Sequence, residues 1–231
     1  MHDVEIGADV VERVTARRGR YHLYDEIDPA TSAFVVVDMQ NAFCKAGAPA
    51  EVPASRGIVS NINRLADQMR TAGAQVIWIV SAFDNKGGVS DWENFFNYIV
   101  AADVREKTMA YMSPGAEGAA LWHELDNRDE DTLVVKNRYN TLVPGSSQLE
   151  RVLRSRGIET VIIGGTKTNI CCETMARTAF DMDFKVVLVN DCCAALSDRE
   201  HLAALENVIQ QFGDVMTASE VAERLGKVPS D

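Results

Sequence analysis

Three residues that can do chemistry stand at or just after the ends of predicted buried strands. Asp38 directly follows one apolar run, Lys136 ends a second, and Cys171 follows a third after a short loop. Ligands of open α/β sheets bind beyond the carboxyl ends of the strands. We therefore expect a carboxylate, an ammonium and a thiol to share one crevice.

These groups are sufficient for a hydrolase with a cysteine nucleophile. A thiol with a reference pKa of about 8.5 needs a base or a positive potential to become a thiolate near neutral pH. Asp38 can accept the proton and return it to a leaving amine, while Lys136 keeps the carboxylate ionised and favours the thiolate. A helix predicted to begin near residue 170 adds N–H groups that can bind an oxyanion. The set predicts acyl transfer.

Each of the three residues also has an ordinary structural interpretation. Asp38 alone suits a turn or a helix cap, and Lys136 alone suits a solvated surface cation or half of an ion pair. A lone buried cysteine is usually a small hydrophobic residue. Spacing alone leaves the functional and the structural interpretations evenly balanced.

The elements that must position these residues alternate regularly between strand and helix. This alternation predicts a single α/β domain with a parallel sheet and helices on both faces. Predicted strands lie at 33–37, 75–81, 132–136, 160–165 and 185–190, with a weak strand at 214–217; predicted helices lie at 57–73, 91–100, 146–156, 170–182 and 197–211, with another at the C-terminal end.

The chain shows no linker or internal repeat, so we divide it into an N-terminal arm over 1–30 and one hydrolase-type domain over 31–231. The arm contains RRGRYHLYDEIDPA, which is too polar and aromatic for a core element. We expect it to pack on a neighbour or to cover an edge of the sheet.

Composition narrows the class of partner. The formal net charge of -11, from 34 acidic and 23 basic residues, argues against nucleic acid or an anionic membrane and favours a small-molecule substrate. Five cysteines, including two adjacent pairs, form a poor disulfide framework and indicate a reducing compartment. Without a signal peptide or a transmembrane run, the sequence predicts a cytoplasmic protein.

Nothing in the sequence requires a cofactor or a metal. The first predicted strand is not followed by a glycine-rich dinucleotide fingerprint, and no P-loop motif occurs. The four histidines are too far apart for a His-based zinc site. We expect one of them, His201, to lie on a helix surface.

The segments VVVDMQNAFC, VVKNRY and GGTKTNICCETMARTA, in this order, resemble the isochorismatase-like hydrolases, also called the cysteine hydrolase family. The similarity runs from about residue 31 to about residue 218. It implies a three-layer α/β/α sandwich with a six-stranded, mostly parallel, Rossmann-like sheet, and a homo-oligomer, either a dimer or a tetramer.

By motif position, the resemblance makes Asp38 the general base, Lys136 its electrostatic partner and Cys171 the nucleophile. It also implies a cis peptide bond between Thr166 and Lys167. The backbone N–H groups of Lys167 and Cys171 then form the oxyanion hole.

Within the family, the metal-dependent nicotinamidases carry an Asp and two His after the second strand, whereas this chain has Asp84 and no histidine there. True isochorismatases lack the cysteine. The chain is more similar to metal-free carbamoyl and ureido amidohydrolases, such as N-carbamoylsarcosine amidase and ureidoacrylate amidohydrolase. We expect a cysteine-dependent amidohydrolase acting on a small linear amide, ureido or N-carbamoyl compound; the alternatives are a non-amide hydrolase, for an ester or vinyl ether, and a catalytically idle ligand-binding scaffold.

Residues after strand ends and in the aromatic loop are expected to bind substrate: Asn41, Trp92, Phe96 and Tyr139. The aromatic members fit a subunit interface equally well. Pocket shape depends on loops 82–99 and 137–145, and a neighbouring subunit can also contribute.

Several further residues are open to two interpretations. Lys167 stands where relatives have a small apolar residue and can meet an anionic substrate or point to solvent, with solvent slightly favoured. Arg138 and Arg177 can bind a substrate carboxylate, although Arg177 fits a structural ion pair better. Asn169 is expected to cap the helix after it, and Ala42 replaces a second Asp of many relatives.

The cysteine doublet holds only one candidate nucleophile. Successive helical residues point about 100° apart, so Cys171 and Cys172 cannot both face the crevice. Motif position and the preceding loop favour Cys171, leaving Cys172 to pack against the sheet. Cys192 and Cys193 are expected to be structural.

Overall fold

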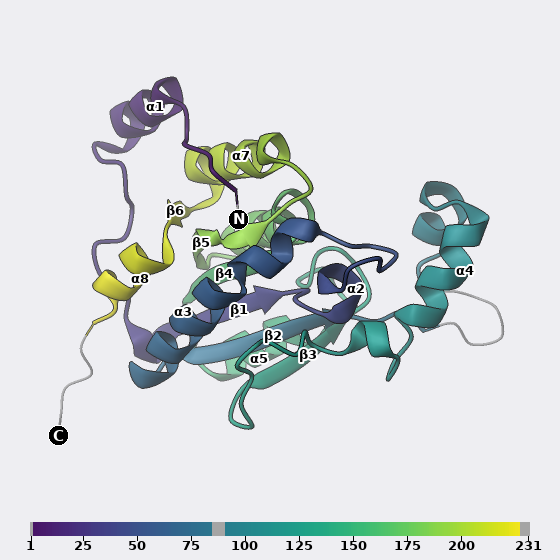
Figure 1. Ribbon diagram of the computed structural model, residues 1–231. Helices are drawn as coiled ribbons and strands as arrows, with labels where there is room; N and C mark the ends of the chain where they lie inside the picture. Colours follow the sequence, from purple (N-terminus) through teal and green to yellow (C-terminus); the bar gives the residue numbers. More distant parts are fainter. Residues whose placement is uncertain (1, 85–90, 227–231) are drawn as a thin grey trace.

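The computed structural model describes residues 2–84 and 91–226. At its centre lies a six-stranded sheet with the order β3-β2-β1-β4-β5-β6, in which every neighbouring pair runs parallel (Figure 1). The predicted α/β fold is confirmed, and the sheet is entirely parallel. Its strands are β1 (Ser32–Val37), β2 (Gln75–Ser81), β3 (Thr132–Lys136), β4 (Thr160–Thr166), β5 (Lys185–Ala194) and β6 (Asp214–Met216).

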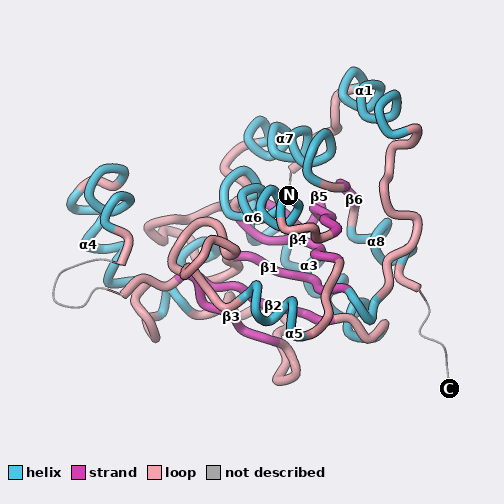
Figure 2. The backbone as a smooth tube through the Cα atoms, turned by 180° about the vertical axis from the view of Figure 1, so that it is seen from behind, coloured by secondary structure: helices cyan, strands magenta, loops and turns pink. Residues whose placement is uncertain are grey.

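Helices cover both faces of this sheet, as Figures 1 and 2 show from opposite sides. The first face is covered by α3 (Val59–Thr71) and α8 (Ala218–Arg224). The second is covered by α1 (Ala8–Arg18), α5 (Leu149–Ser155), α6 (Glu173–Asp181) and α7 (Asp198–Asn207). Short helical segments complete the connections: η1 (Pro29–Thr31), α2 (Asn41–Cys44), η2 (Pro53–Ile58), η4 (Phe95–Ile99), η5 (Glu117–Ala119), η6 (Thr168–Cys172) and η7 (Val208–Phe212).

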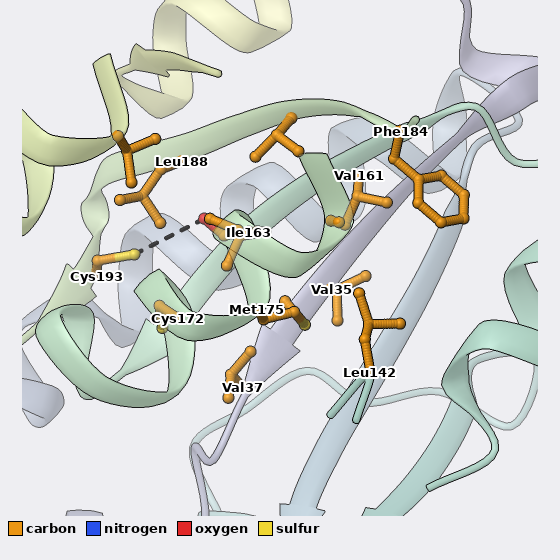
Figure 3. Close-up of a cluster of buried hydrophobic side chains, with 14 of the residues drawn as sticks. Val35, Val37, Leu142, Val161, Ile163, Cys172, Met175, Phe184, Leu188 and Cys193 are labelled. Carbon is orange, nitrogen blue, oxygen red and sulfur yellow. Dashed lines mark hydrogen bonds between the residues drawn. The ribbon is translucent and has the colours of Figure 1, made fainter. Parts of the chain in front are cut away.

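Strand β1 shows how the sequence builds two cores. Val35 and Val37 belong to the core beneath α5 and α6, whereas Phe34 and Val36 belong to the core beneath α3. Successive strand residues point to opposite faces, and both faces are covered, so the strand reads as a continuous apolar run. Figure 3 shows part of the core beneath α5 and α6, where Val35 and Val37 lie near Met175 of α6.

The strand order predicts a ligand site at the carboxyl ends of the central strands. From β1 the chain moves outward to β2 and β3, and then returns to β4 on the other side of β1. The carboxyl ends of β1 and β4 therefore flank the point where the strand order reverses, which is where open parallel sheets bind ligands.

Helix α4 (Ala102–Tyr111) was not expected from the sequence. In Figure 1 it stands off the body of the protein, beyond the carboxyl ends of the strands. Only Thr108 and Met109 of this helix are buried, so it lacks the apolar stripe from which an amphipathic helix is predicted. The helix predicted over 91–100 is also shorter, and spans residues 93–99.

The N-terminal segment lies along the β6 edge of the sheet. Helix α1 packs on the second face. Beyond it, the Leu23 N–H donates to the Asp214 carboxylate of β6 at 2.6 Å, and Ile27 forms a parallel bridge with Leu225. The segment thus covers an edge strand that otherwise exposes unpaired backbone groups.

Candidate active site

The side chains of Asp38, Lys136 and Cys171 converge at the carboxyl edge of the sheet. Lys136 Nζ lies 2.9 Å from Asp38 Oδ2 and 3.6 Å from Cys171 Sγ. The Asp38 carboxylate also lies near enough to Cys171 to raise the pKa of its thiol. Cys171 is 5% exposed, and the other two residues are exposed by 1% or less. The three groups form one buried cluster.

The backbone delivers the three groups from three different strands. Asp38 leaves β1 in the left-handed region, with φ 54°, a conformation that Asp tolerates better than most side chains. Lys136 is the last residue of β3. Cys171 lies in η6, which follows β4 and continues into α6.

The end of β4 lies very close to β1. Gly165 pairs in register with Val37 and has φ 113°, which favours glycine. A Cβ at this position would lie 2.0 Å from the Val37 carbonyl oxygen. The next two residues, Thr166 and Lys167, are joined by a cis peptide bond, at the position that the family resemblance implies.

Ser81 joins the cluster and was not singled out from the sequence. Its Oγ accepts a hydrogen bond from Lys136 Nζ at 2.9 Å and donates one to Asp38 Oδ1 at 2.9 Å. Ser81 is the last residue of β2 and pairs in register with Lys136. Lys136 Nζ also donates to the Arg138 carbonyl at 3.0 Å. The ammonium therefore has several acceptors although it is buried.

Burial and charge set the protonation of the cluster. Burial lowers the pKa of the Lys136 ammonium, but Asp38 and Cys171 raise it by more, so the net pKa lies above its ordinary value. Burial raises the pKa of the Cys171 thiol well above its ordinary value; Lys136 opposes this shift and Asp38 adds to it. Lys136 thus acts on the thiol in the expected direction, but burial is stronger. The net effect on Cys171 therefore favours the neutral thiol over the thiolate.

The backbone around Cys171 begins a helix. The N–H groups of Ile170 and Cys172 both donate to the Lys167 carbonyl, at 3.1 and 3.2 Å. The Cys171 N–H lies between them in the first turn, where N–H groups point along the helix axis. The oxyanion hole formed by the N–H groups of Lys167 and Cys171 stays a prediction.

A small pocket of about 100 Å³ opens onto Cys171. Its walls are mainly aromatic and aliphatic, and its polar side chains are few. Trp92 and Tyr139 line it as expected, with their rings 4.7 Å apart at their centroids. The remaining lining residues are Phe43, Ala50, Ser81, Phe83, Phe95, Thr108, Met112, Arg138, Lys167 and Ile170.

Two expected substrate-binding residues do not line this pocket. Asn41 is directed toward η5, where its side chain donates to the Glu117 carbonyl at 2.9 Å. Phe96 is 1% exposed and packs edge-to-face against Phe83, behind the pocket wall. Both lie close to the lining residues in sequence, but periodicity does not fix the direction of a side chain in an irregular segment.

The three cations of uncertain role divide into two groups. Arg138 and Lys167 line the pocket, and neither forms an ion pair with a carboxylate of the described residues. The Arg138 guanidinium lies 5.3 Å from the centroid of the Trp92 ring. Arg177 instead pairs with Glu173 at 2.6 Å, which fits the structural interpretation. The direction of the Lys167 side chain, toward a substrate or toward solvent, stays a prediction.

Two predictions near the nucleophile were wrong. His201 is fully buried rather than on the helix surface, because its Nδ1 and Nε2 find Thr168 and Asn190, each at 2.8 Å. Asn169 does not cap the helix: the N-cap position belongs to Lys167, and no side chain caps that end.

The other cysteines are structural. Cys172 is fully buried in the core beneath α6, beside Cys193 (Figure 3). Cys192 is equally buried on the opposite face of the sheet. None of these thiols lines the pocket, whereas Cys171 does, in agreement with the choice of Cys171 as the member of the doublet that faces the crevice.

The loop after β2, in which related nicotinamidases carry metal ligands, is only partly described. Residues 85–90 of the predicted pocket loop 82–99 lie outside the described residues. Among residues 2–84 and 91–226, there is no cluster of three or more His, Cys, Asp or Glu that could hold a metal ion.

A sequence profile of the isochorismatase domain matches residues 32–220. The chain is 30% identical over 206 residues to the ureidoacrylate amidohydrolase RutB of Rhizobium rhizogenes, covering 84% of this chain and 83% of that protein. It is 32% identical over 196 residues to RutB of Yersinia enterocolitica, covering 80% and 84%.

Solved structures show the same fold. A cysteine hydrolase from Pseudomonas syringae superposes with a TM-score of 0.78 at 26% identity, covering 89% of this chain and 96% of that one. N-carbamoylsarcosine amidase from Thermoplasma acidophilum superposes with a TM-score of 0.64 at 21% identity, covering 81% and 96%. The second likeness is one of fold alone.

Proposed function

The chain belongs to the isochorismatase family of hydrolases, and we propose that it is an amidohydrolase that cleaves a small linear amide, ureido or N-carbamoyl compound through an acyl-enzyme on Cys171. The observation that carries this proposal is that Lys136 contacts both Asp38 and Cys171, and that Cys171 lines a small pocket.

The geometry supports a two-step reaction. As Cys171 Sγ attacks the carbonyl carbon, its proton passes to Asp38, and the carbonyl oxygen becomes an oxyanion held by backbone N–H groups. Asp38 then returns that proton to the leaving nitrogen as the carbon–nitrogen bond breaks. In the second step Asp38 takes a proton from a water molecule as the water oxygen attacks the thioester carbon. The carbon–sulfur bond then breaks, the acid product leaves, and Asp38 returns the proton to Cys171 Sγ.

Lys136 provides a positive charge that balances the negative charge on Asp38 or on Cys171 during the reaction. It remains an ammonium throughout, because the pKa of this group lies above its ordinary value. When the thiol proton moves to Asp38, the positive charge beside both groups favours the developing thiolate. The buried pair thus favours loss of the thiol proton as the carbonyl is attacked.

The pocket supports a short substrate that carries a negative charge. A volume of about 100 Å³ is smaller than the roughly 150 Å³ of an engineered cavity that holds benzene. The walls are apolar, while Arg138 and Lys167 supply positive charge and no lining residue is acidic. A ureido acid with a short, flat carbon chain meets these requirements.

The test is a panel of ureido acids and small neutral amides, scored for released ammonia. Wild-type protein is compared with Cys171→Ala and with Cys172→Ala, a matched control on the adjacent buried thiol. We expect turnover in the wild type and in Cys172→Ala, and none in Cys171→Ala. Turnover that survives in Cys171→Ala contradicts the mechanism, and release of an alcohol or enol without nitrogen indicates an ester or vinyl ether hydrolase. Ligand binding without any turnover indicates the idle scaffold.

The cellular location, the oligomeric state and the partners are predicted from the sequence. No helix in the described part of the chain is long and apolar enough to cross a membrane. The cytoplasmic location, the homo-oligomer and the lack of nucleic-acid and membrane partners stay predictions.

A further inference from the structure

We propose that Ser81 is a positioning residue of this site, and that its hydroxyl turns the Asp38 carboxylate so that Oδ2 receives the Cys171 proton. The proposal rests on the amidohydrolase mechanism above. Its carrying observation is that one hydroxyl stands between the two charged members of the cluster, 2.9 Å from each.

The direction of these hydrogen bonds is fixed by the donors available. An ammonium has no acceptor, so Lys136 must donate to Ser81 Oγ. The only hydrogen of that hydroxyl is then free to point at Asp38 Oδ1, which is an acceptor when ionised. Ser81 therefore links the ammonium to one particular oxygen of the carboxylate: its hydroxyl accepts from Lys136 and donates to Asp38 Oδ1.

The two oxygens of Asp38 are consequently different. Oδ1 accepts the hydroxyl of Ser81. Oδ2 lies 2.9 Å from Lys136 Nζ, but it accepts no well-directed hydrogen bond from the described residues, although it is buried. A buried carboxylate oxygen with spare accepting capacity is suited to take a proton. This assigns proton transfer to Oδ2.

Gln40 holds Ser81 in place through its backbone. Gln40 Oε1 accepts from the Ser81 N–H at 2.6 Å, and Gln40 Nε2 donates to the Ser81 carbonyl at 2.9 Å. The same amide nitrogen donates to the Gly118 carbonyl at 2.8 Å. Gln40 follows Asp38 by two residues. One short segment therefore supplies both the carboxylate and the amide that holds the backbone of Ser81. This gives the glutamine of the segment DMQ a physical role.

Other titratable groups face this cluster and must stay unchanged in a test. Lys136 pairs with the carboxylate directly, and Cys171, Cys172 and Cys44 lie near enough to sense its charge. Tyr139 faces Cys171 from the pocket wall, and burial raises the pKa of its hydroxyl. Ser81 itself carries no charge, so replacing it removes a hydrogen bond without changing the charge of the site.

The experiment compares Ser81→Thr with Ser81→Val, two side chains of almost the same shape that differ in the hydroxyl. Ser81→Ala gives the simple deletion. Ser32→Ala is the matched control, since Ser32 is a buried serine at the opposite end of β1 whose hydroxyl donates to the Asp28 carbonyl. Each variant is assayed on the substrate found in the amide panel.

We expect Ser81→Val and Ser81→Ala to lose about ten- to a hundredfold in kcat with little change in KM, as for one hydrogen bond to a charged group. Ser81→Thr retains most of the wild-type kcat, and Ser32→Ala is unchanged.

Two results overturn the proposal. One is equal kcat for the threonine and valine variants, whether both are active or both inactive. The other is a loss in Ser81→Val that appears in KM alone. Because the threonine-to-valine ratio cancels effects of shape on folding, it decides even if Ser81→Ala does not fold. A wild type without turnover of any amide, and unchanged on Cys171 after incubation with substrate, instead refutes the proposed function.

Discussion

The Lys136 ammonium lies 2.9 Å from Oδ2 of Asp38, with both side chains withdrawn from water. A charge pair of this kind is costly to form and more costly to break, because removing one member leaves the other buried and unpaired. The pair belongs to the fold as much as to the chemistry.

This pair predicts a specific pattern of stability. Lys136→Met should lower the free energy of unfolding by about 3–5 kcal/mol, since it strands the Asp38 carboxylate. Adding Asp38→Asn should restore part of that loss, because the stranded charge is then gone. Urea unfolding of the two single variants and the double variant measures the coupling. Losses that simply add argue against a coupled buried pair.

The protonated state of Cys171 can be read from its rate of alkylation. Burial raises the pKa of this thiol well above its ordinary value, so the thiolate fraction is small at neutral pH. The rate with iodoacetamide should therefore keep rising through the alkaline range. Peptide mass spectrometry should find Cys171 modified before Cys172, which has no access to the pocket. A rate already constant at pH 7, or earlier labelling of Cys172, contradicts this account.

His201 should make stability depend on pH. Burial, assisted by the neighbouring His2 ring, lowers the pKa of His201 to about 3 in the folded protein. An unfolded histidine titrates near 6.5, so between these values the unfolded chain binds more protons. The stabilisation is therefore complete above pH 6.5 and is lost as the pH falls toward 3, by up to about 1.4 kcal/mol per pH unit.

The variant His201→Gln isolates this contribution, since an amide can accept from Thr168 and donate to Asn190 without titrating. Urea unfolding between pH 4 and pH 7 should give a shallower slope for the variant than for the wild type. Parallel slopes for the two proteins place the acid sensitivity elsewhere.

Lys167 should discriminate between charged and neutral substrates. It lines the pocket and has no ion pair with a described carboxylate, so we expect its ammonium to be available to an anionic substrate. Lys167→Met keeps the length of the side chain and removes the charge. We expect KM to rise about three- to tenfold for a ureido acid, the range of a partly exposed ion pair, and to stay the same for a neutral amide of equal length. Equal effects on both substrates indicate a packing role.

The sequence predicted those parts of the protein in which local pattern and final structure agree. Continuous apolar runs located β1 to β5, because strands covered on both faces tolerate few polar residues. Asp38 and Lys136 were found because they break the pattern at strand ends, and Cys171 was found from the motif that contains it.

Residues whose position depends on tertiary contacts were missed or misplaced. Ser81 gives no signal by itself; its role arises from the register that pairs it with Lys136. His201 was placed on the surface because a helix pattern cannot show that two partners await its ring nitrogens inside the protein. Asn41 and Phe96 lie in short or irregular segments, where sequence spacing does not determine orientation.

The close approach of β4 to β1 has a consequence for mutational tolerance. Val37 and Gly165 are the last residues that pair between β1 and β4, just before Asp38 and shortly before the loop to Cys171, so the absent Cβ allows the two strands to lie close together there. In a saturation library, position 165 should accept no replacement, although its residue touches neither substrate nor proton. Gly165→Ala should lower activity as strongly as a substitution in the site itself, because the added methyl group would push apart β1 and β4, which position Asp38 and the loop to Cys171.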